Sequence, residues 1–185
     1  MKVLGVLQSP RRGGTSAALL EAFLEGAREA GAETELVDFP RLSVSGCRGC
    51  LACLEAGRCV LQDEMQPVYD KVAEAAVIAQ AAPVYFDQVS AQAKKFLDRL
   101  HSFLGPELEK RMPPGKKAAF FLAYEHPKPD AYDAVMEWWA GRFRFYFGIE
   151  PAFRMTVHAT GRMDEARRRE LGERARQAGR RLAGG

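Results

Sequence analysis

The 185-residue sequence contains no asparagine and only three histidines, and its four cysteines all lie between positions 47 and 59. It has no apolar run approaching the roughly 20 residues that a membrane-spanning helix needs. The first apolar segment, residues 1–7, is too short for a secretory leader and is soon followed by Arg11 and Arg12. We therefore expect a cytoplasmic protein, in which clustered cysteines indicate metal, cluster or redox chemistry more than structural disulfides.

The low net charge argues against nucleic-acid binding, and the spacing of the histidines argues against a histidine-based metal site. The formal net charge is only +3, and no basic stretch is interleaved with aromatic residues, so nucleic-acid binding has no support. We interpret the arginines between positions 167 and 181 as a solvated helix face. The histidines have no metal-ligand spacing, and we expect His101 at the surface. The length and the 47% hydrophobic content predict one globular domain over residues 1–185.

The hydrophobic pattern predicts alternating strands and helices. Five segments have the composition of strands: residues 2–8, 33–39, 76–81, 117–124 and 151–158. Helical patterns alternate with them, ending with an aromatic-rich helix over 130–147 and an Arg-rich helix over 163–183. This alternation predicts an α/β fold with a doubly wound five-stranded parallel sheet and helices on both faces. The surplus of aromatic residues in 130–147 indicates a contact between subunits of a homo-oligomer.

A polar loop, residues 9–16, follows the first predicted strand at the edge where parallel sheets bind ligands. Gly13 and Gly14 allow a close approach of the backbone, and Thr15 and Ser16 are good N-cap residues for the next helix. The loop lacks both the dinucleotide fingerprint and the lysine of the triphosphate-binding loop. Its hydroxyls and arginines suit a phosphate monoester such as that of FMN; the alternative is an ordinary capped helix.

The cysteines occupy an irregular segment, residues 40–63, in the pattern Cys47-x2-Cys50-x2-Cys53-x5-Cys59. Three thiolates in C-x2-C-x2-C can wrap three corners of a [4Fe–4S] cluster, and Cys59 can return to the fourth. Arg48 and Arg58 are nearby cations that could raise its potential. Free thiols, a four-thiolate zinc site and inert buried cysteines are the alternatives.

A third motif, Pro83-Val84-Tyr85-Phe86, follows the third predicted strand. Together with the loop 9–16, the cysteine triplet and the following Val-Ser-Ala-Gln, it resembles the NADPH-dependent FMN reductase group of flavodoxin-like proteins, and within it the iron–sulfur flavoproteins. The resemblance covers residues 1 to about 125. Two departures are a first loop one residue shorter, with Thr15 and Ser16 in place of Asn and Thr, and Asp87 where glycine is usual. Asp tolerates the backbone angles of such a turn better than most residues.

The resemblance implies a flavodoxin-like fold and an FMN site. Its phosphate would lie on the first loop, at Ser9, Arg11, Gly14, Thr15 and Ser16. Its ring would lie against Pro83, Val84, Tyr85 and Phe86, mostly through backbone groups. A third contact is implied just after the fourth strand, at Ala123 and Tyr124 and as far as Glu125.

The resemblance favours an oxidoreductase that takes electrons from NAD(P)H or a ferredoxin-type donor and passes them to a small acceptor, with an optional [4Fe–4S] cluster. A flavodoxin-like electron carrier without its own substrate and a cysteine-based redox sensor remain alternatives. We assign no catalytic residue. The family's dimers and tetramers also imply a homo-oligomer.

Overall fold

The computed structural model describes residues 1–184 and has a central parallel sheet with strand order β2-β1-β3-β5-β6. These strands are β1 (Lys2–Leu7), β2 (Glu33–Asp38), β3 (Val77–Tyr85), β5 (Lys117–Ala123) and β6 (Glu150–Val157). A short strand, β4 (Gln88–Val89), turns back antiparallel onto β3. This order is that of flavodoxin-like folds, so the fold predicted from the sequence is confirmed.

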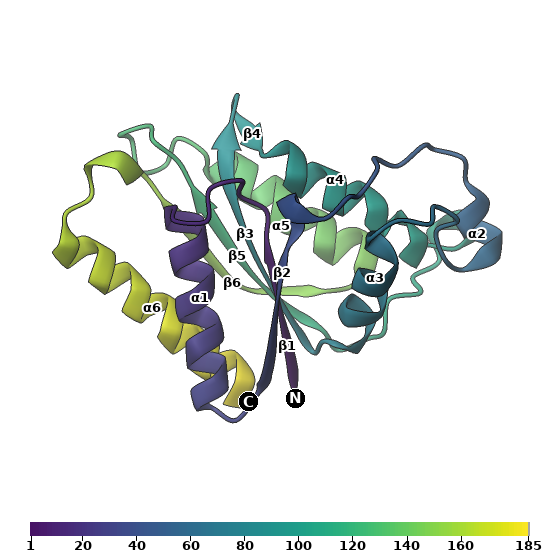
Figure 1. The fold of residues 1–185 in the computed structure, drawn as a ribbon, viewed down its shortest axis with the longest axis horizontal. Coiled ribbons are helices and arrows are strands. Elements are labelled where there is room, and N and C mark those ends of the chain that lie inside the picture. The colour runs from purple at the N-terminus through teal and green to yellow at the C-terminus, as the bar shows by residue number, and fades with distance from the viewer. Residues whose placement is uncertain (185) are drawn as a thin grey trace.

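The described part of the chain contains six α-helices: α1 (Thr15–Glu29), α2 (Ala52–Ala56), α3 (Met65–Glu74), α4 (Ala91–Arg99), α5 (Asp133–Phe147) and, after the last strand, α6 (Glu165–Gly184). Helices α1 and α6 cover one face of the sheet, and α3, α4 and α5 cover the other (Figure 1). Within residues 1–184, no helix has the length and apolarity needed to cross a membrane.

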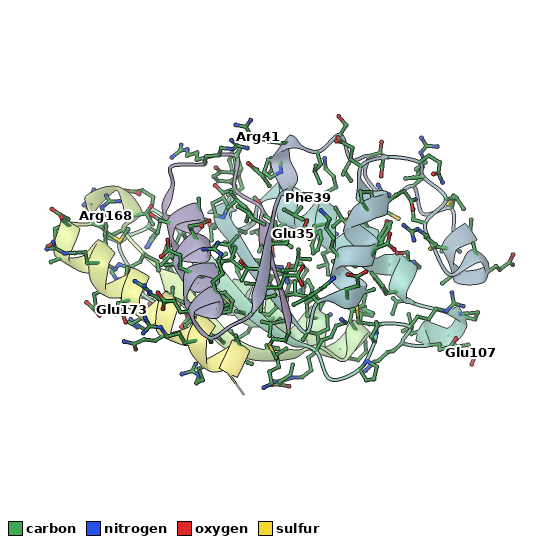
Figure 2. All side chains as sticks on the ribbon, turned by 60° about the horizontal axis from the view of Figure 1, so that its bottom comes forward. Glu35, Phe39, Arg41, Glu107, Arg168 and Glu173 are labelled. Atoms are coloured by element: carbon green, nitrogen blue, oxygen red, sulfur yellow. The ribbon has the colours of Figure 1, made fainter. Side chains whose placement is uncertain are left out.

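Each face of the sheet has its own hydrophobic core. On one face, Trp139 and Phe143 of α5 pack edge-on against Phe120 of β5. On the other face, Phe23 of α1 packs against Phe121, the next residue of β5, because successive strand residues point to opposite faces. Figure 2 shows Phe39 inside the molecule, while Arg168 projects from the outer side of α6.

The parallel strands bring three connecting loops to one edge of the sheet. The carboxyl ends of β1, β3 and β5 all point toward the top of Figure 1. Leu7 at the end of β1 pairs with Ala81, and Pro83 two residues further along β3 pairs with Ala123 of β5. Strand order reverses between β1 and β3, which is where ligands bind in open α/β sheets.

Two local predictions differ from the structure. The loop predicted after residue 81 is instead a longer β3 that continues to Tyr85 and forms a hairpin with β4. Thr15 and Ser16 do not cap α1: Gly14 is the N-cap, and Thr15 is the first helical residue. Ser90 caps α4, accepting a hydrogen bond from the amide of Ala93 at 3.3 Å.

Candidate functional site

The loop after β1 is packed directly against β3 and the start of α4. The amide of Gln8 donates to the carbonyl of Ala81 at 2.9 Å, which extends the pairing of β1 with β3 by one residue. The hydroxyl of Ser90, the cap of α4, donates to the carbonyl of Gln8 at 2.8 Å. These two hydrogen bonds therefore fix the start of the loop 9–14 at the place where the strand order reverses, between β1 and β3.

The N-terminus of α1 is open to an anion. Within residues 1–184 no side chain caps this helix, and its first turn contains no acidic residue. The free amides of a first helical turn and the helix dipole both attract a negative group. The two arginines of the loop differ: Arg12 donates to Asp38 at 2.6 Å, whereas Arg11 forms no ion pair within the described residues. Arg11 is thus the cation left for a phosphate.

Neither Gly13 nor Gly14 is required by a left-handed backbone, although a Cβ atom on Gly14 would lie 3.3 Å from the carbonyl oxygen of Arg11. Gly14 has φ −87°, and Gly13 does not have a positive φ either. A Cβ atom on Gly13 would meet no protein atom within 4 Å. The absence of side chains here leaves an open cradle beside the helix N-terminus, of the kind that a bound phosphate would occupy.

The hairpin between β3 and β4 forms the second wall. Phe86 and Asp87, its two turn residues, are both left-handed, with φ 48° and 59°, as the tightest hairpin turns require. Asp87 accepts a hydrogen bond from the Tyr132 hydroxyl at 2.6 Å, which holds the turn. Phe86 is fully exposed and Tyr85 is 40% exposed, so these rings do not cap the core. They remain free to contact a ligand.

The third segment, after β5, is held by backbone contacts and by Glu125. Tyr124 is buried, and its amide and carbonyl are engaged by Val157 and Thr160. Its hydroxyl donates to the carbonyls of Lys128 and Pro129, so its ring is committed to the loop before α5. The carboxylate of Glu125 accepts from the amide of Gly161 at 2.7 Å and from Thr160, and these bonds lower its pKa. The positive charges of Arg162 and, to a smaller extent, Arg11 also lower the Glu125 pKa, which indicates that the first loop lies near the third.

The four cysteines are free thiols that line one small cavity. Cys53 and Cys59 are partly buried, and Cys47 and Cys50 are exposed. Burial raises the pKa of the Cys53 thiol, and the negative charge that Cys59, Cys47 and Cys50 can carry raises it further, because all three lie close by. Within residues 1–184, no three His, Cys, Asp or Glu side chains are close enough to hold a single metal ion.

The backbone of the cysteine segment is held by side chains from elsewhere. Apart from a turn at 39–41 and the five-residue α2, residues 40–63 are irregular as predicted. Lys95 of α4 donates to the carbonyl of Val44 at 2.9 Å. Gln66 of α3 donates to the carbonyls of Cys59 and Leu61 at 2.8 and 2.6 Å. Arg111 donates to the carbonyl of Leu54 at 2.7 Å, so the segment is anchored along its length.

Two residues near the cysteine segment differ from expectation, and a third carried no signal in the sequence. His101, expected at the surface, is partly buried and its Nδ1 lies 3.5 Å from the Cys53 sulfur. Arg58, expected as a cation for the cluster, instead pairs with Asp70 of α3 at 2.8 Å. Arg99 is buried beside the segment, with the Asp63 carboxylate as its partner. No local sequence pattern predicts these contacts, because the two partners of each contact are far apart in the sequence.

Comparison with known proteins agrees with this architecture. An "Iron-sulfur flavoprotein" of Archaeoglobus fulgidus is 38% identical over 100 residues, 54% of this chain and 46% of that protein. One of Methanosarcina thermophila is 39% identical over 99 residues, 54% of this chain and 52% of its own length. The chain thus spans about half the length of the curated relatives it matches.

Solved structures show the same fold at low sequence identity. The NAD(P)H:quinone oxidoreductase from Methanothermobacter marburgensis superposes with a TM-score of 0.78 at 21% identity, covering 98% of this chain and 96% of its own. An FMN-dependent NADH-azoreductase from Bacillus anthracis, in complex with FMN, gives 0.73 at 16%, covering 99% and 100%. At these identities the likeness supports the fold alone.

The family itself is identified by the sequence over more than half of the chain. The sequence model of NADPH-dependent FMN reductase matches residues 1–128, which include the loop after β1, the cysteine segment and the β3–β4 hairpin. The resemblance inferred from the motifs is therefore confirmed, and this chain belongs to the NADPH-dependent FMN reductase family.

Proposed function

We propose that this chain is an FMN-dependent oxidoreductase that transfers electrons between NAD(P)H, or a reduced carrier, and a small acceptor. The observation that carries the proposal is the meeting of three loops around the uncapped N-terminus of α1, at the reversal of strand order. This is the place and the chemistry that a phosphorylated ring cofactor requires.

The residues present fit FMN. Its phosphate would be held by the first-turn amides and by Ser9, Arg11, Gly14, Thr15 and Ser16. Its ring would lie along Pro83, Val84, Tyr85 and Phe86, bordered by Ala123 and Tyr124. Bound FMN supplies hydride and single-electron transfer, while the protein supplies its position and charge. Because Tyr124 is buried, we assign its contribution to the backbone path after β5 rather than to its ring.

For the cysteine cavity we propose a [4Fe–4S] cluster held by Cys47, Cys50, Cys53 and Cys59. The four thiols surround a cavity without converging on one point. A single tetrahedral zinc, with Zn–S bonds of about 2.3 Å, would need its four sulfurs much closer together. A cluster is larger and takes each thiolate on a different iron. Electrons could then move one at a time between the two cofactors, and a ferredoxin-type protein is a suitable partner.

We also propose that the chain is one flavodoxin-like domain and acts as a homo-oligomer. Both hydrophobic cores pack on the same sheet, which supports a single domain. The aromatic residues of α5 support a contact between subunits, because Phe145 is 60% exposed and Trp138 and Tyr146 line a 420 Å³ groove beside α4.

Purification without oxygen tests both cofactors. We expect about one FMN per chain, with iron and acid-labile sulfide in equal amounts, little zinc, and a visible spectrum of both cofactors. Colourless protein that takes up no FMN would overturn the oxidoreductase proposal. Flavin without iron or sulfide would remove only the cluster.

Catalytic turnover separates the enzyme from the alternative of a flavodoxin-like carrier. With NADPH and a quinone acceptor, we expect steady oxidation over many flavin equivalents, whereas a carrier would stop after one. The cysteine-based redox sensor is separated by a different measurement: reversible thiol oxidation that changes the oligomeric state would favour it, and cysteines without such an effect would remove it.

A further inference from the structure

Arg99, the last residue of α4, has a side chain that is fully buried. Burying a guanidinium costs several kcal/mol unless the surrounding groups pair with it and satisfy its donors. In this chain those groups all come from the cysteine segment and from α3, and none from the sheet. Nη1 donates to the carbonyl of Ser45 at 2.8 Å and to the Asp63 carboxylate at 2.6 Å. Nη2 donates to the same carboxylate at 3.0 Å.

Ser45 and Asp63 lie in the two stems of the cysteine segment, which are the stretches of chain that lead into and out of the part that carries the thiols. They lie just before Cys47 and just after Cys59, and the amide of Ser45 also donates to the Asp63 carboxylate at 3.0 Å. Asp63 further accepts from the amide of Met65 at 3.1 Å, which fixes the outgoing stem to the start of α3. A single buried guanidinium therefore joins both stems to each other and to α4.

From this geometry we infer that Arg99 is the positioning residue that closes residues 45–63 into a loop and holds the four thiols around one cavity before any metal arrives. As far as it concerns a cluster, the inference rests on the proposed function. Joining the stems removes much of the chain entropy that an open segment of this length would lose on wrapping a cofactor. The thiols are therefore preorganised, and cluster assembly requires little rearrangement.

The same side chain reaches the hydrophobic core behind the cavity. Its Nε donates to the Tyr69 hydroxyl at 3.1 Å, and that hydroxyl donates to the carbonyl of Arg99 at 3.2 Å. Cys59 packs against the same hydrophobic core as Tyr69. The guanidinium thus supports the core beside Cys59 through Tyr69, as well as joining the stems. Arg58 makes a suitable comparison, because it also bonds across the segment, to Gln66 and Asp70, but is largely exposed and reaches only α3.

The test compares Arg99→Gln and Arg99→Lys with the control Arg58→Gln. In iron-free protein, hydrogen exchange of the amides in 45–63 should speed up on the order of tenfold or more in Arg99→Gln, as expected for lost hydrogen bonds to charged groups. Exchange in β3 should not change. Arg99→Lys should be intermediate because an ammonium cannot bridge the stems as a guanidinium does. Arg58→Gln should change little because exposed ion pairs contribute little.

Cluster uptake provides the second measurement. After anaerobic reconstitution with ferrous iron and sulfide, Arg99→Gln should hold less cluster, read as visible absorbance per chain, while its FMN content equals that of wild type. Arg58→Gln should match wild type, and Arg99→Lys should recover part of the absorbance. This graded recovery is not expected if Arg99 only stabilises the fold as a whole.

Unchanged exchange in Arg99→Gln, or an equal opening in Arg58→Gln, would overturn the inference. If Arg99→Gln does not fold, Asp63→Asn breaks the same closure from its less buried partner and should show the same local exchange. Hydrogen exchange is measured without iron, so it tests the role of Arg99 independently of any cluster. A wild-type chain that binds no cluster would remove only the cluster proposal.

Discussion

Two adjacent arginines in the loop after β1 differ only in their partners. Arg12 is neutralised by Asp38 at 2.6 Å, and Arg11 is unpaired within residues 1–184. We expect Arg11→Ala to weaken FMN binding about ten- to hundredfold, the effect of losing a hydrogen bond to a charged group. Arg12→Ala should leave it nearly unchanged. Flavin fluorescence titration of apoprotein measures both, and a larger loss in Arg12→Ala would contradict the assignment.

Asp63 connects the stability of the cysteine segment to pH. Burial alone would raise its pKa, but hydrogen bonds from Arg99 and from the amides of Ser45 and Met65 outweigh burial and lower it. A carboxyl group with a lowered folded pKa stabilises the fold above its ordinary pKa near 4, and this contribution disappears as pH falls through the folded value.

Asp63→Asn should therefore destabilise the protein at pH 7, by about 3 kcal/mol, because it leaves the Arg99 guanidinium buried without a counter-charge. The difference between wild type and variant should shrink as the pH falls from 4 to 2. Urea unfolding of both chains at several pH values measures it. An equal difference at pH 7 and pH 2 would show that Asp63 does not titrate against Arg99.

At the scale of elements, the packing of α6 on α1 depends on two glycines at the helix crossing. A Cβ atom on Gly179 would lie 2.0 Å from the carbonyl oxygen of Phe23, and one on Gly26 would lie 1.9 Å from that of Arg176. Neither oxygen can move without displacing its helix. The close approach of the two backbones therefore needs glycine at both positions.

Gly179→Ala should lower the free energy of unfolding by about 1–3 kcal/mol, the usual cost of overpacking. Gly172→Ala is the matched control on the same helix, because its Cβ would meet nothing within 4 Å. This control should be neutral or up to about 1 kcal/mol more stable, since alanine favours helix more than glycine does. Thermal or urea unfolding compares the two variants, and equal effects would contradict the crossing geometry.

At the scale of the whole molecule, the exposed aromatic residues of α5 predict self-association. Phe145→Glu places a charge where a ring is 60% exposed, so it removes little from the core of a single chain. We expect a lower mass by analytical ultracentrifugation with FMN binding retained. Leu36→Glu, at a 45% exposed position on β2, should not change the mass. A wild-type monomer would contradict the proposed contact.

The sequence by itself determined the alternation of strands and helices, the loop after β1 and the irregular cysteine segment. These features depend on local burial and turn chemistry, which periodicity and residue type report directly. The left-handed conformation of Asp87 agrees with the tolerance expected of its residue type, whereas the left-handed Phe86 beside it had no such signal in the sequence.

Only the tertiary structure decided which long side chains serve the two candidate sites. Arg99 and Ser45 are 54 residues apart, and His101 and Cys53 are 48 apart. Their contacts exist because the sheet topology brings α4 alongside the cysteine segment, and no local pattern encodes that approach. The resemblance had already named Arg11, but the pairing that removes Arg12 depended on where β2 placed Asp38. The sequence alone shows which residues have side chains suited to a site. The topology of the sheet determines which of these residues, distant in sequence, come into contact.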